Sequence, residues 1–312
     1  MLVLFFLSRV VAWVAGVRFD VQMLEGAWQL LDTELLRERL FESLVYLHAQ
    51  PPLFNVLTGI ILKLPVSQFL LHLFMFSCGA LLVFAFYELL RFLRINEWLA
   101  AGIVSVFLIV NPSFILYEHL YFYDYPLAAF AAFAGVLLWR GVERQSWRWL
   151  AGFFAVLMVL MLTRSLFHPL WYLVIAGWIV WAVPVDRRRV ALCAGLFLLP
   201  VLLWYGKNLV VFGEFSGSTW LGMSLNKTAQ AKVSRSDLQI LVDEGRISPF
   251  SLSFPFVSID ALPEGSIEEE DWTAPAVGEP YKKSGEPNFN YYGYIQVSDR
   301  MGEDAAVIVR EF

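Results

Sequence analysis

Charged residues are scarce in this chain of 312 residues. Asp, Glu, Lys and Arg make up 16% of it, whereas soluble domains carry about 25%. A soluble protein of this size needs a charged shell around its core, and this composition supplies too few charges to build one. Hydrophobic residues account for 58% of the chain, and its mean hydropathy is +0.60. We therefore expect an integral membrane protein.

Several chemical motifs are also missing from the sequence. Its two cysteines, Cys78 and Cys193, lie inside apolar runs and are expected to act as small hydrophobic residues. There is no Gly-rich phosphate loop, no His/Cys set at metal-binding spacing and no nucleophile elbow. From Gly213 onward, 16 acidic residues accompany 8 basic ones. No stretch resembles a nucleic-acid-binding patch, so we expect no nucleic-acid partner.

Seven apolar runs approach the roughly 20 residues that a helix needs to cross a bilayer. The first run lacks the basic stretch and cleavage pattern of a signal peptide, so we expect it to be retained. We predict an all-α, polytopic fold of about seven spans over residues 1–206, with a mixed extracytoplasmic segment over residues 207–312. The runs cover Leu2–Val17, Gln68–Leu90, Trp98–Phe114, Tyr125–Trp139, Trp149–Leu162, Leu170–Val183 and Val190–Tyr205.

Two polar segments flank these runs. In the loop 18–52, apolar residues recur at helical spacing from Leu24 to Leu40, which is typical of helices lying on a membrane surface. The segment 207–312 contains an acidic run, EGSIEEEDW (264–272), and an aromatic run, NFNYYGYIQV (288–297), which would suit strands or surface contacts. No part of it is apolar enough to span, and we expect further spans beyond Phe312.

Arginines are distributed unevenly among the short loops between the predicted spans. Because basic loops face the cytoplasm, we expect the N-terminus inside and the first loop, the turn at 111–124 and the C-terminal segment outside. The expected location is a bacterial-type inner membrane, with the functional site on its extracytoplasmic side. One set of loops carries Arg91, Arg94, Arg140, Arg144, Arg148, Arg187, Arg188 and Arg189, and the opposite set carries only Arg164.

One acidic residue follows the first predicted span directly. Asp20 could there take a proton from an incoming hydroxyl or amine nucleophile, or it could be an ordinary charge at a helix end. Glu25 and Asp32 compete with it for the role of base. Asp32 is better explained as a helix cap or a solvated charge.

A second acidic cluster lies in YEHLYFYDYP, which contains Glu118, His119 and Asp124. Carboxylates can hold sugar hydroxyls while tyrosine rings stack on the sugar face. An aromatic belt at the membrane interface would explain the tyrosines but not the acids. We leave open a divalent cation between the carboxylates, although their spacing does not favour one, and assign no cofactor.

Cations and a proline pair lie on the same predicted side. Arg164 ends an apolar run, and Lys207 and Asn208 leave the last span, where they would grip a phosphate or simply snorkel to the interface. In HAQPPLFN, two prolines begin a helix whose unpaired N–H groups could bind an anion, with a stiff turn as the alternative. This run adds three candidate binding residues, which are His48, Gln50 and Asn55.

In their order and sidedness, these motifs resemble polytopic glycosyltransferases of the GT-C superfamily, in the protein O-mannosyltransferase-like and aminoarabinose-transferase-like branch. The resemblance covers about residues 1–225. The family usually has an acidic pair after the first span, whereas Val21 follows Asp20 here. The shared features are Asp20, the QPPL run with His48 upstream, Asp124 in YFYDYPL, Leu162-Thr163-Arg164, and KNLVVFGEFSGSTWLG after the last span.

The resemblance implies a hexosyl- or pentosyltransferase that uses a polyprenyl-phosphate sugar donor in the lipid bilayer, with inversion and with Asp20 as base. The acceptor is not indicated. On this reading, Arg164 and Lys207 hold the lipid phosphate, and Glu118 and Asp124 hold the sugar or the acceptor. A transporter or flippase of lipid-linked sugars is the main alternative. It would show polar residues through the midplane and broken helices, and neither pattern is evident from the sequence.

Overall fold

The computed structural model describes residues 1–263, 267–268 and 270–312, and every extended regular element in these residues is helical. The chain divides into two compact units. The first unit comprises Met1–Ala27 and Pro52–Trp204, and the second comprises Trp28–Pro51 and Tyr205–Phe312. The division near residue 205 lies close to the predicted boundary at 206. The assignment of 28–51 to the second unit was not predicted.

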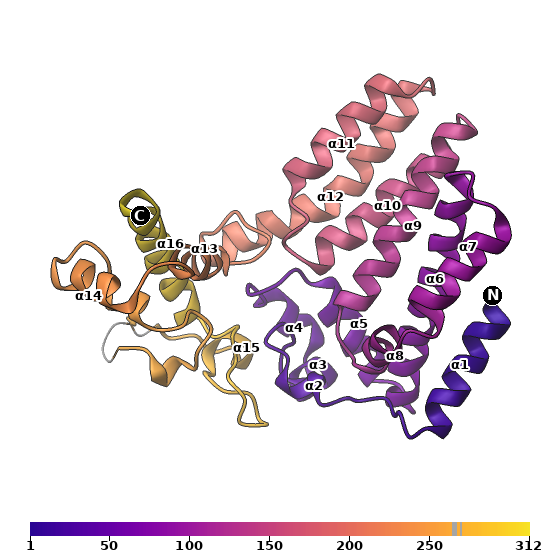
Figure 1. Cartoon of the computed structure of the whole chain (residues 1–312). Helices are drawn as coiled ribbons and strands as arrows, with labels where there is room; N and C mark the ends of the chain where they lie inside the picture. Colours follow the sequence, from indigo (N-terminus) through magenta and orange to yellow (C-terminus); the bar gives the residue numbers. More distant parts are fainter. Residues whose placement is uncertain (264–266, 269) are drawn as a thin grey trace. The chain divides into compact units, whose positions relative to one another are not determined.

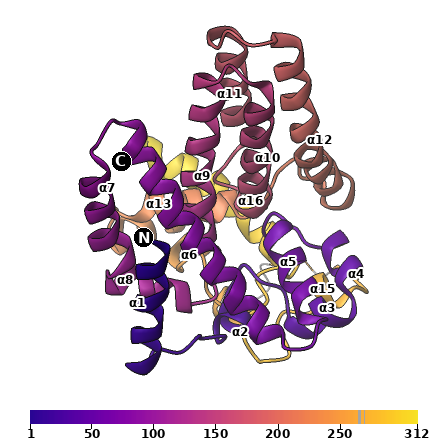
Figure 2. The same cartoon turned by 90° about the vertical axis from the view of Figure 1, so that its right-hand side faces the viewer.

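The first unit is a bundle of apolar helices in which α6 and α10 pack along opposite sides of α9 (Figures 1 and 2). Its centre is formed by buried side chains such as Leu71, Leu82 and Phe154. Its helices are α1 (Leu2–Val14), α2 (Met23–Gly26), α5 (Leu53–Leu62), α6 (Ser67–Phe92), α7 (Glu97–Val104), α8 (Pro112–His119), α9 (Asp124–Glu143), α10 (Trp147–Thr163), α11 (Pro169–Ala182) and most of α12 (Arg187–Phe212).

Three helices in the described part of the chain, α6, α9 and α12, are long and apolar enough to cross a membrane. A fourth candidate is the pair Glu97–Ile109 and Pro112–His119, which is bent by 54°. The other runs predicted as spans form the shorter apolar helices α1, α10 and α11. The turn predicted around Arg164 is confirmed: α10 ends at Thr163, and α11 begins at Pro169 with His168 as its N-cap.

The third predicted span is not one continuous helix, which corrects the sequence prediction. After α7 the backbone widens into a π-helical turn, Ser105–Ile109, and then breaks. Asn111 is the N-cap of a new helix, because its side chain accepts a hydrogen bond from Ser113 N. The next residue, Pro112, is well suited to the first turn of a helix. Residues 112–119, predicted as part of a turn, therefore form α8.

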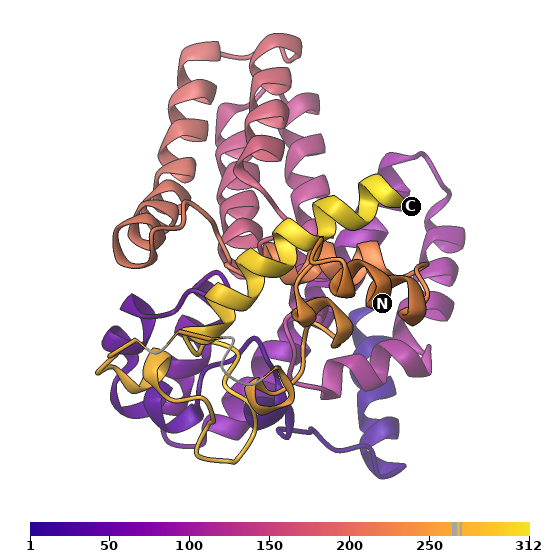
Figure 3. The ribbon, with the colours of Figure 1, turned by 90° about the vertical axis from the view of Figure 1, so that its left-hand side faces the viewer.

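The second unit contains the part of the first loop from Trp28 to Pro51, with two of its short helices, together with the C-terminal segment. The predicted cap is confirmed, since Asp32 accepts hydrogen bonds from Glu34 N and Leu35 N. Figure 3 shows α16 running across α13, and the two are the main helix pair of this unit. Its helices are α3 (Thr33–Glu38), α4 (Leu40–Val45), the end of α12, α13 (Leu221–Gln230), α14 (Arg235–Asp243), α15 (Pro275–Gly278) and α16 (Gly293–Glu311), with short 3-10 turns at Pro249–Leu252 and Ile259–Ala261.

The aromatic run 288–297 forms no strand: its second half is the start of α16. Part of the predicted acidic run, residues 264–266 and 269, lies outside the described residues. Elsewhere the segment packs as helices and loops around buried aromatic side chains, including Phe289 and Tyr294. These two rings lie 4.8 Å apart between centroids.

The crossing of α13 and α16 depends on a glycine. A Cβ at Gly222 would lie 1.7 Å from the backbone oxygen of Ser298. Because a backbone atom cannot swing aside, we expect Gly222→Ala to lower the free energy of unfolding by at least about 1–3 kcal/mol. Gly206→Ala is the control, since no described atom outside the adjoining backbone of its own helix would lie within 4 Å of its Cβ. Thermal melting of the purified chain in detergent tests this. Equal melting temperatures for the two variants would contradict it.

Candidate functional site

The predicted site residues are divided between the two units, and each group is described separately. The first unit contains Asp20, Asn55, Glu118, His119, Asp124 and Arg164. The second unit contains His48, Gln50, Lys207 and Asn208.

Asp20 is held by backbone pairing between the segment after α1 and the segment after α8. Its N–H donates to His119 O at 2.7 Å, and its carbonyl accepts from Tyr121 N at 3.3 Å, forming a parallel bridge with Leu120. One carboxylate oxygen accepts from Gln22 N at 2.8 Å. The side chain is half-buried. The pairing therefore brings Asp20 beside the YEHLYFYDYP run, and its role as a base stays a prediction.

Two neighbouring pockets lie at this end of the first unit and share Val17, Arg18 and His119. The Asp20 pocket has a volume of about 350 Å³, and the His72 pocket has a volume of about 380 Å³. The Asp20 pocket is completed by Asp20, Leu116, Tyr117 and Leu120. The His72 pocket is completed by Trp13, Phe19, Gln68, Phe69 and His72.

His72 and Arg18 line these pockets, although the sequence predicted no binding role for either. His72 lies within an apolar run and would ordinarily be a core residue, but it is half-buried and lines a pocket. Its ring stacks on Phe19 with a centroid distance of 4.8 Å and lies 5.1 Å from the ring of His119. No local sequence signal marked this pairing, because residues 19, 72 and 119 meet only in the folded chain.

Glu118 has a different role from the one predicted. Its side chain is fully buried, and it forms an ion pair with Arg9 at 2.7 Å between Arg9 Nη2 and Glu118 Oε2. Tyr125 donates a further hydrogen bond at 3.1 Å. A Cβ at Gly79 would lie 2.3 Å from Glu118 Oε2, so the carboxylate fills the space left by that glycine. Glu118 therefore joins α1, α6, α8 and α9 and has no face open to a sugar.

Asp124 and Arg164 are brought together, as a shared site requires. They form an ion pair in which the side chains are 44% and 39% exposed, so both remain reachable from outside. The Arg164 guanidinium also lies over the ring of Tyr123. From Tyr123, a row of ring contacts passes through Phe54, Tyr121 and Phe19 toward the His72 pocket. The neighbouring Asn55 is buried in α5.

In the second unit, His48 is a structural residue, which corrects its predicted role in binding. Its Nδ1 lies 2.7 Å from Thr219 Oγ1, and its Nε2 lies 2.9 Å from the carbonyl oxygen of Asn290. The carbonyl can only accept, so Nε2 carries the proton and Nδ1 accepts from the threonine hydroxyl. Burial, with a smaller effect from Lys207, lowers the pKa of His48 to about 3. Both ring nitrogens are therefore occupied in the neutral form.

The neutral, buried His48 makes the stability of the second unit depend on pH. Its folded pKa of about 3 lies below the ordinary value of 6.5, so the unfolded chain binds the proton first as the pH falls. Stability is therefore full above about pH 6.5 and falls below it, by up to about 1.4 kcal/mol per pH unit. We expect His48→Gln to reduce the dependence of the melting temperature on pH between pH 7 and pH 4. His168→Gln, which changes an exposed histidine, should leave that dependence as in wild type. The same slope in wild type and His48→Gln would refute this.

The remaining predicted residues of the second unit also make internal contacts. The Lys207 ammonium donates to Leu47 O and lies 5.2 Å from the ring centre of Phe212. Asn208 is fully buried and donates to Ser216 O at 2.7 Å, and Gln50 is buried as well. These contacts hold the loop 46–51 and the end of α12. A role for Lys207 in binding phosphate stays a prediction.

Within residues 1–263, 267–268 and 270–312, no group of three His, Cys, Asp or Glu side chains is arranged to hold a metal ion. No protein-family model, curated protein or solved structure matches this chain. The resemblance to GT-C glycosyltransferases therefore rests on the motifs of the sequence alone.

Proposed function

We propose that this chain is a membrane glycosyltransferase that moves a sugar from a polyprenyl-phosphate donor to an acceptor at the extracytoplasmic membrane face. The observation that carries the proposal is the position of Asp20 in the wall of a pocket of about 350 Å³ that also contains Arg18 and His119. The carboxylate could take a proton from the acceptor, and the guanidinium could bind the phosphate that leaves the donor.

In the proposed reaction, the acceptor oxygen attacks the anomeric carbon of the sugar as the bond from that carbon to the phosphate oxygen breaks. Asp20 takes the proton of the acceptor hydroxyl, and polyprenyl phosphate leaves with the bonding electrons. A single displacement inverts the anomeric centre. Arg18 lines both pockets and takes the phosphate-binding role first considered for Arg164 and Lys207. The half-exposed pair of Asp124 and Arg164 offers hydrogen bonds to sugar hydroxyls.

The membrane arrangement is part of the same proposal. We infer seven spans, with α1, α10 and α11 crossing as short helices, and the N-terminus in the cytoplasm of a bacterial-type cell envelope. The backbone bridge between Asp20 and Leu120 supports placing Asp20 and the YEHLYFYDYP run on the same side of the membrane, since it joins the segment after α1 to the segment just before α9. Asp20, His119 and Asp124 therefore lie at one end of the helices, which the arginine distribution assigns to the outside.

A transporter or flippase of lipid-linked sugars is the second candidate, and one observation favours it. The break between α7 and α8, with its π-helical turn, is a discontinuous helix of the kind that transporters use. The buried ion pair of Arg9 and Glu118 next to this break adds charge inside the bundle.

One assay separates these candidates. The purified chain is reconstituted in liposomes with a radiolabelled polyprenyl-phosphate sugar, with and without an envelope extract as the source of acceptors. A glycosyltransferase releases polyprenyl phosphate in an extract-dependent manner. A flippase moves the intact donor between leaflets without release. Donor that stays intact and in its original leaflet would contradict both candidates.

A further inference from the structure

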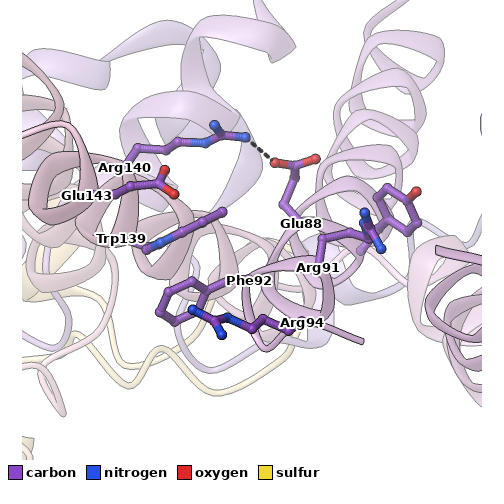
Figure 4. Close-up of a pocket in the computed structure, with 8 residues that line it drawn as sticks. Glu88, Arg91, Phe92, Arg94, Trp139, Arg140 and Glu143 are labelled. Carbon is purple, nitrogen blue, oxygen red and sulfur yellow. Dashed lines mark hydrogen bonds and ion pairs between the residues drawn. The ribbon is translucent and has the colours of Figure 1, made fainter. Parts of the chain in front are cut away.

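A third pocket lies at the opposite end of α6 and α9 from the Asp20 pocket. Its volume is about 550 Å³, and it is formed where the C-terminal turns of these two candidate spans lie side by side (Figure 4). The residues of this α6–α9 pocket used below are Glu88, Arg91, Arg94, Trp139, Arg140 and Glu143.

The charges of the pocket do not cancel. Arg140 is committed to Glu88, at 2.5 Å between Arg140 Nη2 and Glu88 Oε2. Arg91 and Arg94 are exposed, and neither forms an ion pair with a carboxylate in the described part of the chain. Apart from Glu88, which pairs with Arg140, Glu143 is the acidic residue among the described residues that line the pocket. Arg91 Nη1 donates to Ile95 O at 2.8 Å, and a guanidinium has further N–H donors beyond that one. The pocket is therefore net positive and can offer guanidinium N–H groups to an anion.

Arg94 occupies a backbone position that favours glycine. Its φ is +61°, and it follows Leu93, the C-cap residue of α6, with Ile95 N donating to Leu90 O and Arg94 N donating to Arg91 O. This is the Schellman arrangement, in which glycine is usual because other residues pay about 1 kcal/mol for the left-handed conformation. An arginine here costs stability, which points to a use for its side chain.

The aromatic side chains place the pocket at the membrane boundary. The rings of Phe92 and Trp139 lie 4.4 Å apart between centroids, and the Arg140 guanidinium lies over Trp139. Tryptophan is favoured at the level of lipid headgroups. A basic pocket between two spanning helices at that depth matches the position of a lipid phosphate.

We propose that the α6–α9 pocket binds the phosphate headgroup of an anionic phospholipid through Arg91 and Arg94. The acyl chains would lie along the apolar surfaces of α6 and α9. This site is separate from the proposed transfer reaction and does not depend on it.

The test uses the purified chain in a neutral detergent, titrated with phosphatidylglycerol or phosphatidylcholine. Bound lipids are counted by native mass spectrometry. We expect phosphatidylglycerol to bind at lower concentration than phosphatidylcholine. A basic side chain near a lipid phosphate contributes about five-fold in affinity, so Arg91→Gln and Arg94→Gly should each weaken phosphatidylglycerol binding by about that factor.

Three variants make the test specific. Arg94→Gly relieves the backbone strain, so it should melt at the same temperature as wild type or higher while binding less lipid. Glu143→Gln removes the remaining acid and should tighten phosphatidylglycerol binding. Arg188→Gln removes an exposed arginine at the start of α12, outside the pocket, and should leave binding unchanged.

Three outcomes would overturn the proposal. The first is equal binding of the two lipids by wild type. The second is a preference for phosphatidylglycerol that survives both Arg91→Gln and Arg94→Gly. The third is displacement of phosphatidylglycerol by an equal concentration of inorganic phosphate, which would assign the pocket to a soluble anion. None of these outcomes depends on whether the transfer assay succeeds.

Discussion

Asp20→Asn is expected to lower the rate of sugar transfer by about 10²–10⁴-fold, the usual contribution of a general base. The amide cannot take the proton of the acceptor. Folding should be retained, since Asn keeps an oxygen that can accept from Gln22 N, and the pairing with the α8 segment uses only the backbone of residue 20. The measurement is the release of polyprenyl phosphate under single-turnover conditions, alongside thermal melting.

Glu25→Gln is the matched control, because Glu25 is the nearest competing acid in the same loop. It should transfer sugar at the wild-type rate. Full activity in Asp20→Asn would remove that residue from the mechanism. If Glu25→Gln lost the activity instead, the base would have to be reassigned to Glu25.

The second large effect concerns stability rather than chemistry. Arg9→Met should lower the free energy of unfolding by about 3–5 kcal/mol, because it leaves the fully buried Glu118 carboxylate without its cation. Tyr125 alone cannot satisfy that charge. Thermal melting in detergent is the measurement. Arg189→Met is the control, since its ion pair with Asp186 is exposed and should contribute little.

Removing both charges tests the cause of this loss. The combined variant Arg9→Met, Glu118→Leu and Tyr125→Phe removes the buried charges of this pair and leaves no tyrosine hydroxyl deprived of its acceptor there. Well-packed apolar replacements of a buried ion pair are often neutral or stabilising. We therefore expect the combined variant to melt closer to wild type than Arg9→Met does. If it melted lower than the single variant, packing around the pair would explain the effect better than charge.

The apolar periodicity of the sequence was sufficient to predict helices and the turn at Arg164. It could not reveal the break in the third predicted span. Apolar residues lie on both sides of Asn111, and a hydropathy average over a window of residues does not detect a single helix-capping side chain. Nor could it assign residues 28–51 to the unit that contains the C-terminal segment. That assignment depends on long-range contacts such as the hydrogen bond from Lys283 N to Asp32, which no local pattern encodes.

The candidate site was predictable in part. Polar residues at the ends of apolar runs led to Asp20 and His119, which line a pocket, and to Asp124 and Arg164, which form a half-exposed ion pair. The binding roles of all four stay predictions. The same rule predicted a binding role for Glu118, whose side chain is in fact buried against Arg9. Arg9 lies in the middle of the first apolar run and was not considered as a partner. It likewise overvalued His48, whose neighbours Thr219 and Asn290 are distant in sequence. Whether a polar side chain faces solvent or another side chain is a tertiary property.

The two hydrogen bonds that tie residue 20 to the strand-like stretch after α8 also limit how the chain can vary. Residues 23–27 lie beyond this anchor and beyond Gln22, whose N–H holds the Asp20 carboxylate, so insertions there would lengthen the loop without displacing the carboxylate. An insertion between α8 and Leu120 would shift the register of the anchor and turn the acid away from its cavity. Length variation among homologous chains should therefore be common on one side of the anchor and rare on the other.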